Sequence, residues 1–208
     1  MVARTPTTPT RERILYAAAE LFRRQGYAGT GLNQVVAEAQ APFGSLYHHF
    51  PGGKQQLAED VIRAGGVFFQ ALVTAVYDAE PNAEAAVHAV FRGAAETLAA
   101  TDFQDACPIA TIALDVASTS DPLRRATAEV FEQWTTALTE RLDDQGHALA
   151  VLAALEGAFV LCRAQRSTAP MLAAGEMAAA YVRTTLAAPQ RPAGHVAPRV
   201  AGAEPVRG

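Results

Sequence analysis

The sequence predicts an all-α protein, and three observations lead to this fold class. Half of the 208 residues are hydrophobic but only 7% are aromatic, a composition that favours alanine-rich helices in close contact. Apolar residues recur at helical spacing, and the alternating pattern of a half-buried strand is not sustained anywhere in the sequence. Prolines and glycines interrupt the chain where helices would end. We therefore expect a three-helix N-terminal unit followed by a larger helical body.

The first helix is expected to begin near Thr8, with Pro9 at its first position, and to end at Gly26. Its apolar stripe consists of Ile14, Leu15, Ala18, Leu21 and Phe22. Because such a stripe occupies one side of a helix, that side is expected to face a core. This helix completes the three-helix unit.

Two short helices joined by a tight turn are expected between residues 30 and 54. The first has apolar residues at i, i+3, i+4 and i+7, namely Leu32, Val35, Val36 and Ala39. Thr30 is placed to cap its start. Pro42 can occupy the first turn of the second helix, and Gly44 allows another backbone to approach closely.

The second short helix has few apolar side chains for the core, and most of its side chains are expected at the surface. Leu46 and Phe50, four residues apart, would hold it to the core. The rest of its surface carries Phe43, Ser45, Tyr47, His48 and His49. Two short helices in this order indicate a helix-turn-helix, whose second helix enters the major groove of double-stranded DNA.

The helical body begins after a break at residues 51–53. Lys54 opens a long helix with Leu57, Val61, Ala64 and Phe68 on one side. About five further helices follow, separated at residues 81–82, 101–108, 119–122, 145–147 and 167–170. We assign residues 1–53 to a DNA-binding domain, 54–188 to a ligand-binding and dimerisation domain, and 189–208 to a disordered tail rich in proline, glycine, alanine and arginine.

The net charge of −4 conceals an asymmetry along the chain. Residues 1–54 carry six lysines or arginines against three glutamates, a net charge of +3, and the rest of the chain carries −7. A basic head on an acidic body would orient the head toward phosphates. The N-terminus lacks the apolar segment of a secretory signal, and Glu156 interrupts the most apolar run, residues 148–162. We expect a cytoplasmic protein with no membrane partner and two reduced cysteines.

Three segments resemble a known family. Residues 26–57 read GYAGTGLNQVVAEAQAPFGSLYHHFPGGKQQL and resemble the DNA-binding head of TetR/AcrR-type transcriptional regulators. Residues 107–118, CPIATIALDVAS, and 154–167, ALEGAFVLCRAQRS, are similar to the lincomycin-resistance-repressor (LmrA/YxaF-like) branch of that family. The resemblance extends over roughly residues 8–188. It implies a homodimeric repressor in which each head reads half of a near-palindromic DNA operator.

The same resemblance implies roles for particular residues. Those expected at base edges are Pro42, Phe43, Gly44 and Ser45, and those expected at phosphates are Thr30, Tyr47, His48 and Lys54. Two positions depart from the family pattern. Gln40 stands in place of a common glycine, which indicates a turn without positive φ. Phe43 replaces a basic or polar residue, so we expect an apolar contact to a thymine methyl or weaker base discrimination there.

The body is expected to bind a small lipophilic or aromatic effector that changes the separation of the heads and releases the operator. Aromatic side chains on several helices can leave an apolar cavity among them. The candidate pocket residues are Phe68, Phe91, Phe103, Cys107, Phe131, Trp134 and Phe159. Alanine-rich stretches at 148–166 and 171–186 favour a four-helix dimer interface, for which the candidates are Leu155, Phe159, Arg163, Met177 and Tyr181.

Several alternatives accompany this interpretation. Cys107 precedes a proline at a helix start, where a thiolate is stabilised, so a redox sensor or an enzymatic nucleophile is the alternative to a small buried residue. His48 and His49 point about 100° apart on a helix, which disfavours a metal site. Glu156 and Arg163 fit a snorkelling or interface pair, with contact to a ligand as the alternative. A non-specific architectural DNA binder is disfavoured by the acidic body. We predict no enzyme activity, cofactor or metal.

Overall fold

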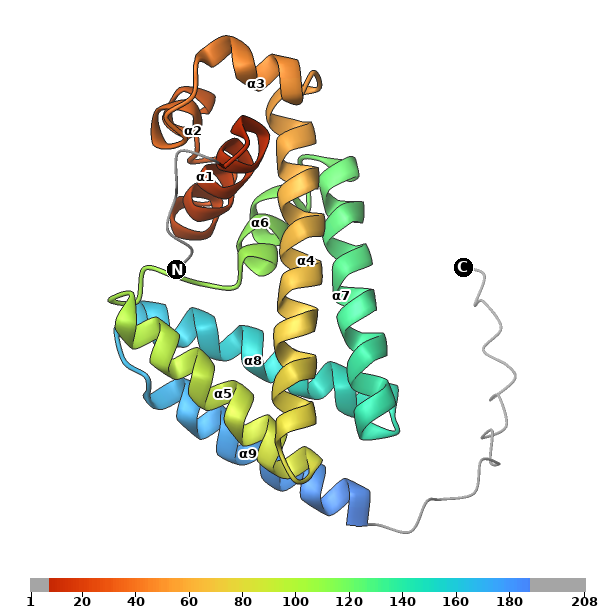
Figure 1. The fold of residues 1–208 in the computed structure, drawn as a ribbon. Helices are drawn as coiled ribbons and strands as arrows, with labels where there is room; N and C mark the ends of the chain where they lie inside the picture. The colour runs from red at the N-terminus through yellow and green to blue at the C-terminus, as the bar shows by residue number, and fades with distance from the viewer. Residues whose placement is uncertain (1–7, 188–208) are drawn as a thin grey trace, which may run out of the picture.

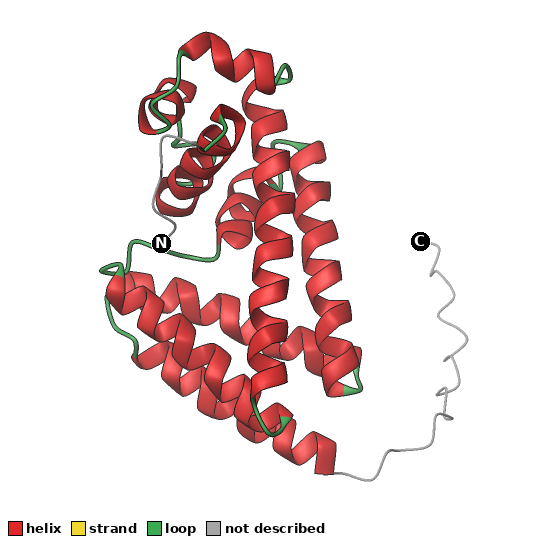
Figure 2. Cartoon of the chain, in the orientation of Figure 1, coloured by secondary structure: helices red, strands yellow, loops and turns green. Residues whose placement is uncertain are grey.

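The computed structural model describes residues 8–187 of the chain, and all regular secondary structure in this range is helical (Figures 1 and 2). The helices are α1 (Thr10–Gln25), α2 (Leu32–Glu38), α3 (Phe43–His49), α4 (Gly53–Ala79), α5 (Ala83–Ala100), α6 (Pro108–Val116), α7 (Asp121–Leu142), α8 (Gln145–Gln165) and α9 (Ala169–Ala187). The predicted all-α class is confirmed. The tail expected at residues 189–208 lies outside the described residues.

Helices α1, α2 and α3 form the head, at one end of the molecule (Figure 1). Its core is built from the apolar stripes that the sequence predicts. The buried side chains are Ile14, Ala17, Ala18 and Phe22 of α1, Val35 and Val36 of α2, Leu46 of α3 and Phe50 beyond it. Burying an aromatic or aliphatic side chain of this size contributes roughly 1.5–3 kcal/mol. The buried residues of the head are continuous with those of the body in one hydrophobic core.

Helix α4 connects the head to the body, where α5, α8 and α9 form the opposite end of the molecule (Figure 1). It packs against α1, α5, α6 and α7, while α8 packs against α5, α7 and α9. Both α4 and α8 are long and apolar enough to cross a membrane by length and composition alone. Within the described residues, 22% of the apolar window of α4 and 28% of that of α8 is buried, and helices of this composition also occur in the cores of helical domains.

Helices α4 and α7 of the body pack closely at Gly66 of α4, where a side chain of α7 lies against the α4 backbone. A Cβ atom on Gly66 of α4 would lie 2.8 Å from both methyl carbons of Val130 on α7. Next to this contact, the Trp134 indole donates a hydrogen bond of 2.9 Å to the Gly66 carbonyl. A residue without a side chain is thus required where α4 meets α7.

The structure corrects four local expectations. Helix α1 begins at Thr10, so that Pro9 occupies the capping position before the first turn. Gly31, not Thr30, caps α2, and its backbone N–H is bound by the Gln34 side chain at 2.8 Å. Residues 145–147 begin α8 and do not form a break, because Asp144 caps that helix by accepting from the His147 N–H at 2.9 Å.

The fourth correction concerns the turn between α2 and α3. The presence of glutamine in place of the common glycine predicted a turn without positive φ. Gln40 has φ of 50°, so this prediction is wrong. The Ala41 N–H bonds to the Val36 carbonyl at 2.9 Å across the turn, as in a helix end closed by a left-handed residue. A left-handed non-glycine residue costs roughly 1–2 kcal/mol, and the turn forms despite that cost.

Candidate DNA-binding face and ligand cavity

Helix α3 presents an aromatic and polar face at the end of the molecule opposite α9 (Figure 1). Phe43 and Tyr47 are 46% and 49% exposed, and their rings meet edge to face with centroids 5.7 Å apart. His48 is exposed beside them. Leu46 and Phe50 are completely buried. Two buried anchors thus hold a short helix whose remaining side chains are free to contact a duplex.

Pro42, Gly44 and Ser45 lie at the start of this helix. Pro42 and Gly44 are exposed and Ser45 is half-buried. A Cβ atom on Gly44 would meet no atom of the described chain within 4 Å, so no part of the described chain makes the close approach that this glycine allows. The small side chains leave space instead for an external molecule to reach the α3 backbone.

Two of the predicted phosphate contacts are engaged within the protein. Thr30 is buried, and its hydroxyl donates to the Gly26 carbonyl at 2.7 Å while Gln25 donates to it at 3.2 Å. Thr30 therefore stabilises the turn between α1 and α2, and its hydroxyl is not exposed for a phosphate. The Lys54 ammonium lies 4.3 Å from the centroid of the Tyr27 ring. Burial lowers the pKa of Lys54, and the Asp115 carboxylate partly opposes this shift.

The arginines that make the head basic are largely paired with acids. Arg11 binds Asp60 of α4 at 2.6 Å, and Arg23 pairs with Asp105 of the body. Arg24 contacts Glu20 within α1 at 3.2 Å. The pairs of Arg11 and Arg23 connect α1 to α4 and to the body, whereas that of Arg24 lies within α1. The positive charge counted from the sequence is therefore not concentrated on α3.

Asp115 of α6 connects the body to the head at a second point. One of its carboxylate oxygens accepts a hydrogen bond of 3.1 Å from the Ala28 backbone N–H, in the turn between α1 and α2. A Cβ atom on Gly26 would collide with the same carboxylate. Asp115 also acts electrostatically on Lys54. This single side chain therefore touches the turn before α2 and influences the first turn of α4.

Replacing Asp115 by alanine is expected to speed amide exchange in residues 26–30 by roughly 5- to 10-fold, because the Ala28 N–H loses its acceptor and a typical hydrogen bond contributes about 1 kcal/mol. Hydrogen–deuterium exchange followed by mass spectrometry measures this change. Asp121→Ala is the control, since among residues 8–187 the ion pairs of that carboxylate are with arginines of its own helix. Equal exchange in both variants would contradict the role of Asp115.

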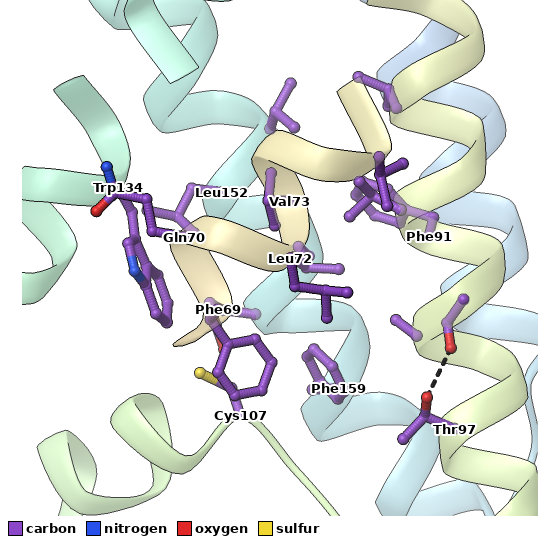
Figure 3. A pocket seen from close by; sticks show the side chains of 18 of the residues that line it. Phe69, Gln70, Leu72, Val73, Phe91, Thr97, Cys107, Trp134, Leu152 and Phe159 are labelled. Carbon is purple, nitrogen blue, oxygen red and sulfur yellow. Dashed lines mark hydrogen bonds between the residues drawn. The ribbon is translucent and has the colours of Figure 1, made fainter. Parts of the chain in front are cut away.

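A cavity of about 440 Å³ lies in the body (Figure 3). Its walls come from α4, α5, α7 and α8 and from the segment before α6, and they are mainly apolar. The side chains labelled in Figure 3 are Phe69, Gln70, Leu72, Val73, Phe91, Thr97, Cys107, Trp134, Leu152 and Phe159. Arg23 of α1 also lines this cavity, so the head and the cavity share a residue.

Four of the seven aromatic and cysteine residues predicted for a pocket line this cavity. They are Phe91, Cys107, Trp134 and Phe159, whereas Phe68, Phe103 and Phe131 do not line it. Phe68 is 64% exposed because the buried stripe of α4 turns away from it. The side chains of α4 that line the cavity include Phe69, Val73 and Tyr77. The spacing i, i+4, i+8 from Phe69 was the signal in the sequence that could have found them.

Glu156 is a polar group in the apolar wall formed by α8. Burial raises its pKa from 4.5 to about 7, and a hydrogen bond with the Cys107 thiol opposes this shift. The expected pair with Arg163 is absent among the described residues, and Arg163 instead donates to the Arg24 carbonyl at 3.4 Å. Burial and the neighbouring Glu156 raise the pKa of Cys107. A buried, protonated thiol is a poor nucleophile, which agrees with a packing role.

The residues predicted for a dimer interface differ in their exposure. Leu155 and Phe159 line the cavity within one chain, whereas Met177 and Tyr181 are exposed. The exposed large apolar side chains of α8 and α9 are Leu149, Val160, Leu161, Leu172, Met177, Tyr181 and Leu186. Their concentration on two neighbouring helices is a feature of protein–protein interfaces.

An N-terminal helix-turn-helix head joined by a long helix to a cavity-containing helical body is the architecture of the TetR-type regulators. Residues 14–61 match the model of the bacterial regulatory proteins of the tetR family. Residues 83–177 match the model described as "Transcriptional regulator LmrA/YxaF-like, C-terminal domain".

Two relatives from Bacillus subtilis (strain 168) are similar over most of their length. The HTH-type transcriptional regulator LmrA is 32% identical over 171 residues, which cover 78% of this chain and 91% of LmrA. The HTH-type transcriptional regulator YxaF is 31% identical over 182 residues, which cover 84% of this chain and 95% of YxaF. The chain belongs to the TetR family, in its LmrA/YxaF-like branch.

Solved structures support the fold. The regulatory protein TetR from Rhodobacter sphaeroides has a TM-score of 0.77 at 20% identity, covering 84% of this chain and 99% of that one. Reduced E. coli NemR has a TM-score of 0.72 at 21% identity, covering 88% of this chain and 100% of that one. Family membership makes this chain a DNA-binding transcriptional regulator and not an enzyme, so the alternative of a catalytic Cys107 is set aside.

Proposed function

We propose that this regulator is a homodimeric repressor that binds a near-palindromic operator through α3 and is released when a small apolar effector occupies the cavity. The observation that carries the proposal is the position of Arg23, which belongs to α1 of the head, lines the cavity and pairs with Asp105 of the body. A ligand that contacts this wall touches the connection between head and body directly.

The coupling would continue through α6. Cys107, two residues after Asp105, caps α6, with its sulfur accepting from the Ala110 N–H at 3.5 Å. At the other end of α6, Asp115 holds the Ala28 N–H. An effector that displaces the start of α6 would therefore shift the head. It releases the operator only if it binds the released state more tightly, because differential affinity is what moves the equilibrium.

A dimer supports specific recognition. One head presents few base-reading side chains, whereas two heads about 34 Å apart read successive turns of the same major-groove face. The exposed apolar side chains of α8 and α9 offer the surface on which two chains would join. The domain boundary at residue 53 remains part of this proposal, since α4 starts in the head and continues into the body.

The test is selection of bound duplexes from a random pool by the purified full chain, followed by titration of the selected operator at fixed salt. The proposal expects a two-fold-symmetric sequence bound at least about 1,000-fold more tightly than random duplex. A ratio near one would favour a non-specific architectural binder. Operator affinity that is unchanged when the cavity is occupied would contradict the ligand response.

Within α3, the expected effects differ between Tyr47 and Phe43. Tyr47→Phe removes only the hydroxyl and keeps the contact with the Phe43 ring, so binding to all duplexes should weaken by on the order of 10-fold through loss of a phosphate contact. Phe43→Ala should change base preference at one position of each half-site. Repeating the duplex selection with each variant measures base preference, and titration of the operator and of a random duplex at fixed salt measures affinity.

Arg63→Gln is the matched control for these variants, because Arg63 is exposed further along α4 and contacts Glu59 of the same helix. Its affinity and base preference should stay within about two-fold of the parent protein. An altered base preference in Tyr47→Phe, with none in Phe43→Ala, would reverse the assignment of the two side chains.

A further inference from the structure

The cavity contains a carboxyl group that lacks a cation. Glu156 lines the cavity from α8, where its neighbours in the wall include Leu152, Leu155 and Phe159. Its Oε2 atom is buried and has no hydrogen-bond partner within residues 8–187. No ion pair to Glu156 occurs in that range either. A buried acceptor without a donor is costly, so this group is a place where a ligand can gain affinity.

The cations that line the cavity are already neutralised by other acids. Arg23 pairs with Asp105 and lies 2.5 Å from Glu20. Arg141 binds Asp78 at 2.6 Å near the surface. The positive charges at the cavity are therefore paired with acids other than Glu156, and the described residues give the Glu156 carboxyl no cation.

The chemistry of this arrangement selects among ligands. An ammonium group would give the buried carboxylate a charge partner and a donor at once. The terminal torsion of a glutamate is broad, so the carboxylate can turn its free oxygen toward a donor in the cavity. A ligand carboxylate would be repelled, and a wholly apolar ligand would leave the acceptor without a donor.

We propose that the cavity takes an apolar molecule that carries one protonated amine, and that the Glu156 carboxylate binds this ammonium group. A volume of about 440 Å³ accommodates a small molecule of this kind. The inference rests on the proposed ligand-responsive function for its biological meaning. The binding itself is measurable without DNA.

Three probes of one carbon skeleton test the proposal with the full-length protein at pH 8: 4-cyclohexylbutylamine, 4-cyclohexylbutan-1-ol and 4-cyclohexylbutanoic acid. Trp134 is the single tryptophan of the chain and lines the cavity, so its fluorescence reports occupancy by these non-aromatic probes. The amine should bind at least about 10-fold more tightly than the alcohol and the acid.

Glu156→Gln separates charge from shape, because the amide keeps the size of the side chain. In this variant the amine should lose its advantage, while the alcohol binds within about two-fold of its original affinity. Glu96→Gln is the control, since Glu96 also lines the cavity but is exposed on α5. That variant should retain the preference for the amine.

An amine that binds no more tightly than the alcohol would overturn the proposal, as would an amine preference that survives in Glu156→Gln. Retained alcohol binding shows that the variant is folded and its cavity intact. The amine preference and the ligand-responsive function are refuted by different results. Selective amine binding without any change in operator affinity would refute only the ligand-responsive function, whereas operator release by the alcohol or acid alone would refute only the amine preference.

Discussion

Replacing Gly26 by alanine is expected to lower the free energy of unfolding by on the order of 3 kcal/mol. Gly26 ends α1 with φ of 78° and ψ of 170°, a conformation that is essentially restricted to glycine. The added methyl group would also collide with the Asp115 carboxylate, which then retreats from the Ala28 N–H. Backbone strain and the loss of a hydrogen bond therefore act together at the junction of head and body.

Denaturant unfolding of both proteins at one concentration measures the effect, since the stability of a dimer depends on protein concentration. Gly93→Ala is the matched control. A Cβ atom at Gly93 meets nothing within 4 Å, and the residue lies inside α5, so this variant should gain roughly 0.5–1 kcal/mol from helix propensity. A loss below about 1 kcal/mol in Gly26→Ala would contradict the strain argument.

The stability of the protein is expected to fall by about 2–3 kcal/mol relative to Glu156→Gln as the pH rises from 4.5 to 8. Burial raises the pKa of Glu156 from 4.5 to about 7. Below its unfolded pKa the carboxyl is protonated in both states, and the folded protein has no charge to bury. As the pH rises from 4.5 toward the folded pKa of about 7, the carboxyl ionises in the unfolded state but keeps its proton in the native state. The unfolded state is therefore increasingly favoured.

Glu156→Gln removes this titration and keeps an oxygen acceptor for the Cys107 thiol. The two proteins should have similar stabilities near pH 4.5, and the variant should be the more stable one at pH 8. Urea unfolding across this pH range makes the comparison, with Glu96→Gln expected to follow the parent protein. Parallel pH profiles for the parent and Glu156→Gln would show that Glu156 ionises without a folding penalty.

The helix-turn-helix was predictable because its determinants are local. Leu46 and Phe50 are four residues apart and both are buried as expected, which leaves Tyr47 and His48 outside. The same local reasoning was wrong for the cap of α2, because Gly31 occupies that position and the Thr30 hydroxyl instead binds the Gly26 carbonyl. The expectation for Gln40, which came from its departure from the family pattern, was also wrong, because Gln40 has a positive φ although it is not glycine.

The cavity was only partly predictable because its lining depends on how α4 rotates against its neighbours. Phe68 and Phe69 are adjacent and equally apolar, yet Phe68 is 64% exposed and Phe69 lines the cavity. Gly66, three residues before Phe69, is the point at which α4 packs closely against Val130 of α7. The charge asymmetry was correctly counted, but partners distant in sequence, such as Asp60 and Asp105, engage the arginines of the head.

The sequence by itself determined the helical class, the order of the helices, the recognition helix and the family, because hydrophobic spacing, turn residues and motif spacing are properties of neighbouring positions. Only the tertiary structure decided that Arg23 and Asp115 connect head and body and that Glu156 lies in an apolar wall without a cation. Each of these contacts depends on residues that are distant in the chain and are brought together in the protein interior. Helix packing determines which residues meet, and the local sequence pattern does not show it.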